Sequence, residues 1–524
     1  MFFLENKITT YSISFSKNDF NTDLVITTSS LSILHFSKKE IKRHAIESHS
    51  NGDIFKAIYY YQFFLDLGFS DPEVFAYYGV ILKGSKQLGK AIEILEQGIK
   101  LFPEHPTSYN NLGNIFRENN KLKEAEILIR KAIQIKPNYA MAYNNLGSVK
   151  KDLDQLLEAE YFTRKAIQID PCLFLANLNL AIILKDLGSI SEAESFACIA
   201  LDLNPNDPDA HFNLSLIQLL KGNYNNGLEN FEYRSKVKYP ALPHANPNIK
   251  RFSKINKFTH EKLLIISEQG FGDTLQFMRY VPYLKRMGLD ISFCANKKLH
   301  SIIKTSRIDS NPLTLKQGNF VKDGKWISLL SLPKLLKVNP CNPIINEPYI
   351  HSTDELMQKW KFILSKEKCP IIGINWQGNR NAEQNSLKGR SIPLEKFSFI
   401  AKNTSIKLLS LQKGYGSDQL DNCSFNNKFV NCQGEVEKIW DFLEIASIIA
   451  NCDLIITSDT YVAHLAGGMG KLTWLLLKDV PEWRWGLSSN TTFWYPSIKL
   501  FRQKVRNNWS ELMERVSNEL SSIY

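Results

Sequence analysis

The chain has 524 residues, of which 44% are hydrophobic and 22% are charged, and its formal net charge is +11. This composition is typical of globular proteins and excludes a disordered or fibrous chain. At about 100–200 residues per domain, the length predicts two to four domains. The lysines are scattered and there is no long arginine-rich run, so the charge favours an anionic small ligand, such as a nucleotide sugar, over nucleic acid.

The cysteines and the N-terminal residues indicate in which cellular compartment the protein is expected. None of the eight cysteines forms a CxxC pair or a zinc-finger spacing, which favours a reduced compartment and no metal site. The first residues lack the pattern of a secretory signal. No apolar run approaches the about 18 residues of a membrane span. We therefore expect a cytoplasmic protein without a transmembrane segment, and peripheral membrane contact stays open.

A repeat occupies the first half of the chain, after a segment (1–37) with no readable pattern. Two stretches that begin with YNNLG align at a spacing of 34 residues, which is the tetratricopeptide period. Large apolar, small and proline positions recur in this register. They are Tyr78, Leu112, Leu146, Leu180 and Leu214; Gly79, Gly113, Gly147, Ala181 and Ser215; Ala57, Ala91, Ala125, Ala159 and Ala193; and Pro103, Pro137, Pro171 and Pro205.

These residue types have a physical role in a helical array. Small residues let two antiparallel helices approach closely, and proline ends the second helix of each pair. The spacing therefore predicts an α-solenoid of five clear tetratricopeptide repeats and one degenerate repeat over residues 38–236. Such an array presents a concave face that usually binds a protein or peptide. A purely structural role and self-association are alternatives.

The periodicity changes after three prolines at 240, 243 and 247, which indicate a linker. Short apolar runs then alternate with helical patterns, for example at 273–288 and 297–306, which predicts parallel sheets built from βαβ units. A helical segment at 354–368 separates two such series, so we expect two doubly wound halves. Strand-like runs lie at 262–267, 290–295, 370–378, 406–414, 453–460 and 472–477.

Polar turns follow strand-like runs in both halves. In such folds, ligands bind at the carboxyl ends of the strands, so these turns predict a cleft to which both halves contribute. The residues expected to line this cleft are Gln269, Gly270, Gly272, Trp376, Gly378, Asn379, Gln412 and Lys413.

The stretch SEQGFGDTLQF (267–277) fails as a dinucleotide fingerprint, because Leu275 stands where the third glycine belongs. Asp273 would also place a carboxylate where a pyrophosphate binds a helix N-terminus. That position suits a general base or a residue that holds a hydroxyl group. The simpler interpretation is a helix cap. Gly270 and Gly272 leave room for a substrate.

Candidates for anion binding lie in the second series. Arg390 can reach a phosphate, although a lone arginine after a polar loop is usually surface charge. The strand-to-helix turn at 456–470 offers a cap and, beyond it, backbone amides for phosphate oxygens. His464 is on the first turn of that helix, where histidine is more often structural. The donor-binding candidates are Arg390, Ser458, Asp459, Thr460, Tyr461 and His464.

Aromatic residues are concentrated at 481–503. Their rings can stack on a sugar or a base, but packing is the favoured interpretation. These residues are Trp483, Trp485, Trp494 and Tyr495.

Several stretches together resemble a group of bacterial proteins in which tetratricopeptide repeats are fused to a heptosyltransferase-like domain of glycosyltransferase family 9. The stretches are EQGFGDTLQFMRYVPYL, GINWQGN, RSIPL, LLSLQKG, DLIITSDTYVAHLAGGMGKLTWLLL and EWRWGL with FWYPSIKLFRQ. The resemblance covers nearly the whole chain from about residue 38. It implies a GT-B fold, with the active site between two facing Rossmann-like halves. It also implies metal-independent, inverting transfer from a nucleotide-diphosphate sugar, with no cofactor besides this donor.

The resemblance also implies roles for individual residues. Asp273 matches the general base that acts on the acceptor hydroxyl, and Asp459–Thr460 match the turn that helps to hold the donor pyrophosphate. Arg390 corresponds to the basic residue before the proline of the first C-terminal loop. The sequence departs from the family at Tyr461, where glycine is common, and at 470–472, where Gly-x-Pro is usual. These departures concern the identity of the donor more than the fold.

Three hypotheses follow for the function. The leading one is a glycosyltransferase whose repeats select or position the acceptor. The others are a protein O-glycosyltransferase analogous to the O-GlcNAc enzymes and a scaffold whose transferase domain is inactive. The expected boundaries are 1–37 (unassigned), 38–236 (repeats), 237–260 (linker), 261–365 (acceptor-side half), 366–502 (donor-side half) and 503–524 (C-terminal helix).

Overall fold

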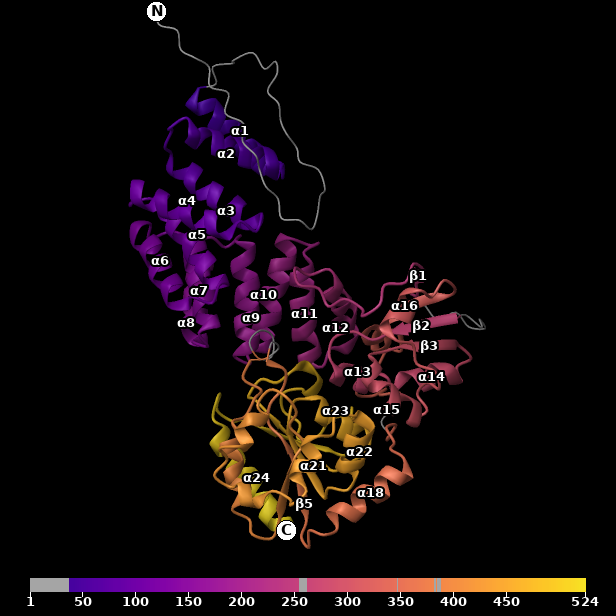
Figure 1. Ribbon diagram of the computed structural model, residues 1–524. Coiled ribbons are helices and arrows are strands. Elements are labelled where there is room, and N and C mark those ends of the chain that lie inside the picture. Colours follow the sequence, from indigo (N-terminus) through magenta and orange to yellow (C-terminus); the bar gives the residue numbers. More distant parts are fainter. Residues whose placement is uncertain (1–36, 254–261, 346, 381–382, 384–387) are drawn as a thin grey trace, which may run out of the picture. The chain divides into compact units, whose positions relative to one another are not determined.

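The computed structural model describes residues 37–253, 262–345, 347–380, 383 and 388–524 (Figure 1). Residues 1–36 of the unassigned segment, residues 254–260 of the expected linker and residues 381–382 and 384–387 of the polar loop before Arg390 lie outside the described residues. The chain divides into two compact units, one up to Asn145 and one from Leu146 onward. Each unit is described by itself.

The first unit consists of paired helices joined by short turns, as the 34-residue period predicts. Gly113 illustrates why small residues recur, since a Cβ there would lie 2.6 Å from Cγ1 of Ile129 on the partner helix. The helices are α1 (Lys38–Ser50), α2 (Ile54–Asp66), α3 (Pro72–Gly84), α4 (Leu88–Leu101), α5 (Pro106–Glu118) and α6 (Leu122–Ile135), and α7 (Ala140–Asp152) crosses into the second unit.

The repeats continue in the second unit and end in a short 3₁₀ helix, so the helical run over 38–231 matches a tetratricopeptide solenoid. Proline begins α11 and Gly222, with φ of 93°, ends it, a pairing that suits the two ends of a helix. The elements are α8 (Leu156–Ile169), α9 (Phe174–Asp186), α10 (Ile190–Leu203), α11 (Pro208–Lys221), α12 (Tyr224–Phe231) and η1 (Glu232–Ser235).

A four-stranded parallel sheet follows, in the order β1-β4-β2-β3. Its edge strand β1 falls inside the segment expected to be a linker. The strands are β1 (Lys250–Arg251), β2 (Lys262–Ile266), β3 (Asp290–Cys294) and β4 (Lys325–Ser328). The helical elements are α13 (Phe271–Phe277), α14 (Tyr280–Arg286), η2 (Lys297–Leu299), α15 (His300–Thr305), α16 (Leu315–Asn319), η3 (Leu329–Ser331), α17 (Leu332–Leu335) and α18 (Asp354–Leu364).

A second parallel sheet has five strands in the order β6-β5-β7-β8-β9. Its strands are β5 (Ile371–Asn375), β6 (Lys407–Ser410), β7 (Leu454–Ser458), β8 (Thr473–Leu477) and β9 (Ile498–Arg502). The helical elements are η4 (Leu394–Phe397), α20 (Ser398–Ala401), η5 (Ser417–Leu420), η6 (Asn426–Lys428), α21 (Gln433–Glu437), α22 (Phe442–Ala450), α23 (Tyr461–Gly468), η7 (Trp483–Trp485) and α24 (Trp509–Ile523).

Burial explains why the strands read as continuous apolar runs. Every residue of β5, β7 and β8 is buried, because helices cover both faces of the sheet, as in other parallel sheets. The edge strand β9, by contrast, alternates between buried and partly exposed residues over part of its length. The strand-like runs of the sequence correspond to β2, β3, β5, β6, β7 and β8, whereas β1, β9 and the internal strand β4 were not expected.

The helix expected over 273–288 is interrupted between α13 and α14. Pro282 has no N–H to donate to the carbonyl of Met278, so the helix cannot run through this point unbroken. The amide of Val281 instead bonds the Met278 carbonyl at 3.0 Å, three residues back. The correction places Arg279 at the junction between two short helices.

Arg279 is buried and joins the regions that carry the two sheets. Its guanidinium donates to the backbone oxygens of Gln276 at 2.8 Å, Ile345 at 3.2 Å and Trp494 at 2.7 Å. It also lies over the ring of Tyr495, 4.5 Å from the centroid. Several hydrogen bonds to one buried cation fix the loop after β8 against α13.

A buried ion pair joins the end of the repeats to the first sheet. Arg234 in η1 donates to both oxygens of Glu268, which directly follows β2, at 3.2 and 2.7 Å. Ser328 and the amide of Leu330 also donate to Glu268. Because both charged side chains are almost fully buried, their hydrogen bonds are needed to offset the cost of removing them from water.

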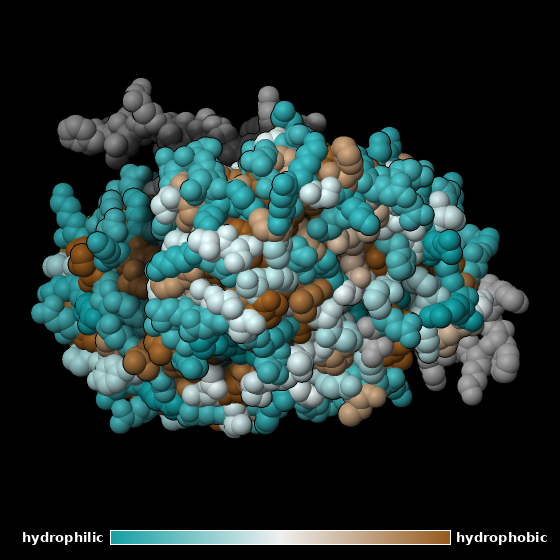
Figure 2. All heavy atoms as spheres, turned by 90° about the horizontal axis from the view of Figure 1, so that it is seen from below, coloured by the Kyte–Doolittle hydropathy of each residue, from teal (hydrophilic) through white to brown (hydrophobic). Residues whose placement is uncertain are grey.

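The face of the molecule seen from below Figure 1 is mostly hydrophilic (Figure 2). Hydrophobic side chains form small, separate patches on it. Singly exposed apolar residues, such as Phe362 and Trp440, are normal on protein surfaces.

Candidate functional site

Asp273 lies on the first turn of α13, at the carboxyl end of β2. Its Oδ2 accepts a hydrogen bond from the amide of Gly270 at 2.9 Å, so it does cap the helix. Its Oδ1 accepts a hydrogen bond from Nη2 of Arg484 at 2.6 Å. The carboxylate is 19% exposed and therefore accessible to a ligand. Asp273 thus caps its helix while part of its carboxylate stays accessible to solvent.

Arg484 links this aspartate to the second sheet. It lies in η7, in the loop that follows β8, and its Nη1 donates to Oε1 of Glu482 at 2.6 Å. Its side chain is 9% exposed, and no hydrogen-bond partner of its Nε is found within the described part of the chain. One guanidinium therefore holds two carboxylates that come from different sheets.

The helices that follow β2 and β7 are in direct contact. A Cβ on Gly272 of α13 would lie 2.8 Å from Cδ2 of His464 and 3.5 Å from Cα of Tyr461, both on α23. Any larger residue at 272 would push the two helices apart. The glycine thus allows a close approach between the halves, and the space it leaves is filled by His464 rather than by a ligand.

Arg390 lies beside the turn that follows β7. Its Nη1 donates to the backbone oxygen of Asp459 at 3.0 Å, and its Nε donates to Glu383 at 2.6 Å. The guanidinium passes over Gly378, where a Cβ would lie 2.7 Å from its Cζ. With 14% of its side chain exposed, Arg390 is a held and partly accessible cation.

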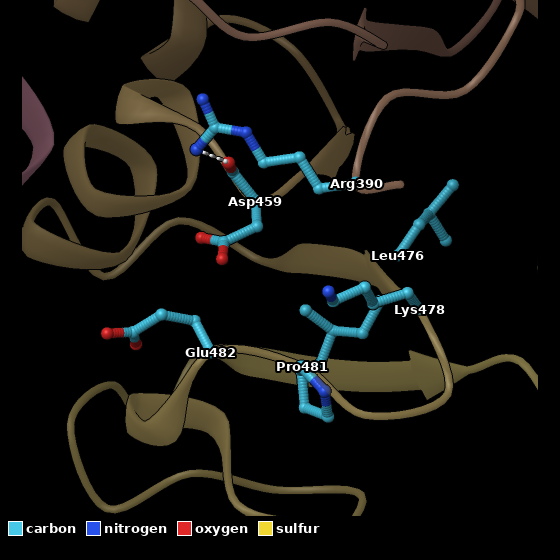
Figure 3. Close-up of a pocket in the computed structure, with 7 residues that line it drawn as sticks. Arg390, Asp459, Leu476, Lys478, Pro481 and Glu482 are labelled. Carbon is cyan, nitrogen blue, oxygen red and sulfur yellow. Dashed lines mark hydrogen bonds between the residues drawn. The ribbon is translucent and has the colours of Figure 1, made fainter. Parts of the chain in front are cut away.

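A pocket opens at the carboxyl ends of β7 and β8 (Figure 3). The space between its lining atoms is about 270 Å³, which includes space open to solvent, and the enclosed part holds no more than about one water molecule. The side chains of Asp459 and Glu482 extend toward the same side of it (Figure 3). The lining residues are Arg390, Asp459, Leu476, Leu477, Lys478, Pro481 and Glu482.

Burial and crowding of negative charge shift the acids of this pocket. Burial, opposed by Arg484 and reinforced by Asp459 and Asp273, raises the pKa of Glu482 to about 7. Burial also raises the pKa of Asp459, although the charge of Arg390 opposes the shift. A carboxyl group whose pKa lies near neutrality can accept or donate a proton at working pH.

His464 is a buried wall residue. Its Nδ1 lies 3.0 Å from the Tyr495 hydroxyl, and its ring stacks on Trp485 with centroids 5.5 Å apart. Burial, together with Arg484 and other nearby cations, holds the pKa of His464 well below its usual value. The ring is therefore neutral, so the expected phosphate-binding role cannot come from a positive charge on His464.

The turn after β7 is arranged by side-chain hydrogen bonds. Thr460 caps α23 by accepting from the amide of Val462 at 3.3 Å, and its hydroxyl donates to Asn375 at 2.8 Å. The hydroxyl of Ser458 is buried, and no partner for it is found among the described residues. The ring of Tyr461 packs edge-on against Phe442 at 5.3 Å. Thr460 therefore orients the turn, and Tyr461 packs beside it.

Two residues expected to line the cleft are instead buried. Trp376 is in the core of the second sheet, and its Nε1 donates to the Gly416 oxygen at 3.1 Å. Gln412 is buried and accepts hydrogen bonds from Asn375 and from the amides of Trp376 and Gln377. These placements correct the expectation. In the sequence both residues lie in stretches that resemble polar turns. In the structure, their polar side-chain atoms are hydrogen-bonded within the protein.

The other cleft-lining candidates are spread over the ends of both sheets. Gln269 and Asn379 are exposed, and Gln269 has φ of 59°. Lys413 donates to the Val436 oxygen at 2.5 Å, and burial lowers its pKa to about 8. None of these three residues lines the pocket described above.

The aromatic residues of the loop after β8 are packed, as the favoured interpretation predicted. Four of them are almost fully buried and contact one another and Tyr224 of the last repeat. They are Trp483, Trp485, Trp494 and Tyr495. This cluster gives η7 a rigid base, which fixes the direction of Arg484.

The sequence analysis missed the charged residues of this same loop. Glu482 and Arg484 fall within the stretches quoted for the resemblance and Lys478 directly follows one of them, but aromatic residues dominated the interpretation of the region. The signal that could have revealed them is Glu-Trp-Arg-Trp after a buried strand, where charges flanked by large apolar residues need partners.

The turns inside two of the helix pairs of the second unit, α7–α8 and α9–α10, contact the loops around the pocket. Arg506, which follows β9, donates to Asp154 at 2.7 Å and to the backbone oxygen of Asp186 at 3.3 Å. Lys388, just before Arg390, donates to the backbone oxygen of Asp152 at 2.8 Å. Lys478 in turn donates to the Lys388 oxygen at 3.1 Å. The last repeats therefore support the loops that carry the pocket.

Two kinds of feature are missing from the part of the chain that the structure describes. No group of three or more histidine, cysteine, aspartate or glutamate residues is placed to hold a metal ion there. Nor does any described helix have the length and apolar character needed to span a bilayer.

Comparison with known proteins identifies the repeats. A family model described as tetratricopeptide repeat matches residues 84–140, whereas no curated protein matches the chain. Similar solved structures include a thermophilic TPR protein of Thermus thermophilus, with 18% identity over 35% of this chain and 100% of that one and a TM-score of 0.32.

Two further structures have comparable similarity. YrrB, a TPR protein with an unusual peptide-binding site, is 21% identical over 32% of this chain and 87% of its own, with a TM-score of 0.26. PilF of Pseudomonas aeruginosa is 13% identical over 38% of this chain and 90% of its own, with a TM-score of 0.34. The family model and the helical run together show that the chain contains tetratricopeptide repeats.

Proposed function

We propose that the two parallel sheets form a GT-B glycosyltransferase of the heptosyltransferase-like type. In this proposal the enzyme moves a sugar from a nucleotide-diphosphate donor to an acceptor that the repeat array selects or positions. The observation that carries the proposal is the meeting of Asp273, Glu482 and Arg484 in one charge cluster, with Asp459 beside it. These residues follow β2, β7 and β8, at the strand ends where such folds bind ligands.

The donor side of the proposed site is the pocket with Arg390 and the turn into α23. Arg390 offers a fixed guanidinium, which suits bidentate contact with phosphate oxygens. The first-turn amides of α23 follow Thr460 and add the positive end of a helix dipole. Together these groups would stabilise the diphosphate as it leaves.

Asp273 is the proposed general base on the acceptor side. It would take the proton of the acceptor hydroxyl while that oxygen attacks the anomeric carbon of the donor sugar. Its exposed carboxylate and its position opposite the turn after β7 support this role. Each carboxylate oxygen has a second lone-pair direction, so the hydrogen bonds from Gly270 and Arg484 leave room for the acceptor.

A search for the donor tests the proposal. Purified full-length protein would be screened with ADP-, GDP-, UDP- and CDP-linked sugars by thermal shift and then by release of the nucleoside diphosphate. We expect one donor class to stabilise the protein and to turn over, and Asp273→Ala to abolish turnover. Absence of binding by every nucleotide and nucleotide sugar would contradict the proposal.

Two observations favour the scaffold alternative. Both oxygens of Asp273 are already hydrogen-bonded, and the pocket is small for a whole nucleotide sugar. A folded but inactive transferase domain would look the same. The same screen separates the two, because an inactive scaffold neither binds nor consumes a donor. Sugar attached to a co-purifying polypeptide would instead support protein O-glycosylation.

A further inference from the structure

Both terminal nitrogens of the Arg484 guanidinium contact carboxylates in this structure. Nη2 contacts Asp273 and Nη1 contacts Glu482, both at 2.6 Å. The amide of Arg484 also donates to Oε2 of Glu482 at 2.9 Å. Asp273 and Glu482 therefore share the charge of one guanidinium.

This arrangement works against the proposed chemistry. The guanidinium compensates the negative charge of Asp273, so less of that charge is available to attract the hydrogen of an acceptor hydroxyl. For Asp273 to act as a base, the contact with Arg484 must weaken when the substrates are bound.

The surroundings show what could weaken it. Arg484 is largely buried, its Nε has no partner within the described residues, and its partner Glu482 lines the pocket with Arg390 and Lys478. A diphosphate that enters this pocket carries more charge than one carboxylate and offers planar oxygen pairs to a guanidinium fork. It would therefore compete with Asp273 for Arg484.

We propose that Arg484 is a positioning residue that keeps Asp273 charge-compensated until a nucleoside diphosphate group in the pocket draws its guanidinium away. Asp273 then loses its cation and its negative charge becomes available to the acceptor hydroxyl, so deprotonation of the acceptor is tied to the presence of the donor. This inference rests on the proposed function and specifies its donor-binding step.

Because of the charges that face Glu482, the binding of the donor should change the number of protons bound to the protein. These charges are Arg484 on its own loop, Asp459 from the end of β7 and Asp273 from α13, and Arg390 and Lys478 line the same pocket. When the guanidinium moves to the diphosphate, Glu482 and Asp273 lose their shared cation. A proton from solvent would then bind to the carboxyl pair, chiefly at Glu482, whose pKa of about 7 leaves it partly ionised.

The test counts protons during binding of ADP, GDP and UDP to the full-length protein. Isothermal titration at pH 7.5 in two buffers of different ionisation enthalpy gives the number of protons taken up. We expect the wild type to take up roughly half to three-quarters of a proton more than Glu482→Gln, because about a quarter of Glu482 is already protonated at this pH. The difference between the two proteins cancels any proton released by the nucleotide itself. Glu514→Gln, an exposed site on α24, is the matched control and should behave as the wild type.

A second variant keeps the test decisive if Glu482→Gln does not fold. Asp273→Asn removes the competitor for Arg484, so the nucleoside diphosphate should bind several-fold more tightly although transfer is lost. If the contact between Asp273 and Arg484 is merely structural, Asp273→Asn should bind the nucleoside diphosphate more weakly or with unchanged affinity. Arg484→Lys keeps the positive charge but loses the paired N–H donors of the guanidinium. This variant should therefore bind the nucleoside diphosphate more weakly and take up fewer protons.

The outcomes separate this inference from the proposed function. If a nucleoside diphosphate binds with equal proton uptake in wild type and Glu482→Gln, and Asp273→Asn does not raise its affinity, the inference is overturned and the proposed function stands. If none of the three nucleotides binds, both fail. Extra uptake that depends on Glu482, or tighter binding by Asp273→Asn, supports the inference.

Discussion

Nη2 of Arg484 lies 2.6 Å from Oδ1 of Asp273, and the two residues are 211 positions apart in the chain. Asp273 follows the second strand of the first sheet and Arg484 follows the fourth strand of the second sheet. The contact therefore depends on both halves being folded and in place. It brings a capping carboxylate, a shared cation and an acidic pocket into one site.

The first prediction concerns Asp273. Asp273→Asn keeps the size of the side chain and removes the ability to accept a proton as a base. We expect the transfer rate to fall by about 10²–10⁴-fold, the range of general-base catalysis. Transfer would be measured with the donor found by the screen, and binding of the matching nucleoside diphosphate should persist. Asp418→Asn, at an exposed residue of η5, is the control and should retain full activity.

The second prediction concerns the glycine beneath Arg390. A methyl group at residue 378 would lie 2.7 Å from Cζ of Arg390, so Gly378→Ala should displace the guanidinium. We expect affinity for the nucleoside diphosphate to fall by about tenfold, the effect of losing roughly 1.4 kcal/mol. Gly434→Ala is the matched control, because a Cβ there meets nothing within 4 Å. Equal affinity in the two variants would show that Arg390 does not contact the ligand.

The third prediction concerns pH. The pKa of Glu482 rises from its ordinary value of 4.5 to about 7 on folding, so between these pH values the folded chain holds a proton that the unfolded chain has released. The free energy of unfolding therefore falls as the pH rises through this window. Glu482→Gln removes this dependence and should be more stable than the wild type above pH 7.

The measurement is thermal unfolding of both proteins between pH 5 and pH 8. The gap in Tm between Glu482→Gln and the wild type should widen as the pH rises. The corresponding difference in the free energy of unfolding should reach up to about 3 kcal/mol. A gap that is constant over this range would mean that Glu482 titrates at its ordinary pKa.

The fourth prediction concerns the buried pair between the repeats and the first sheet. Arg234→Met leaves Glu268 buried without its cation and should destabilise the second unit by about 3–5 kcal/mol. Thermal unfolding would report this as a lower Tm. Lys262→Met breaks the exposed pair with Asp323 and should leave Tm unchanged. If both variants have the same Tm, the pair between Arg234 and Glu268 contributes no more to stability than an exposed ion pair does.

Local periodicity explains what the sequence could predict. The 34-residue spacing and the alternation of apolar runs with helical patterns depend on neighbours along the chain, so they identified the solenoid and the strands β2, β3 and β5 to β8, but not the internal strand β4. The break between α13 and α14 was also predictable in principle, since Pro282 cannot donate its amide to Met278. The interpretation followed the amphipathic pattern and overlooked the proline.

The site depended more on contacts between distant residues. Asp273 was singled out by its place after a strand, but its partner Arg484 lay in a stretch interpreted as aromatic packing. Trp376 looked like a turn residue, and only the fold shows that its ring belongs to the core. His464 was placed at the right helix end, yet its neutral state follows from burial and from arginines far away in sequence.

A crystal structure of the protein with a bound nucleoside diphosphate tests the central claim most directly. We predict that the diphosphate contacts Arg390 and the turn at Asp459–Tyr461 and that it faces Asp273. A nucleotide bound at Gly270–Gly272 without contact to the second sheet or its loops would contradict the account.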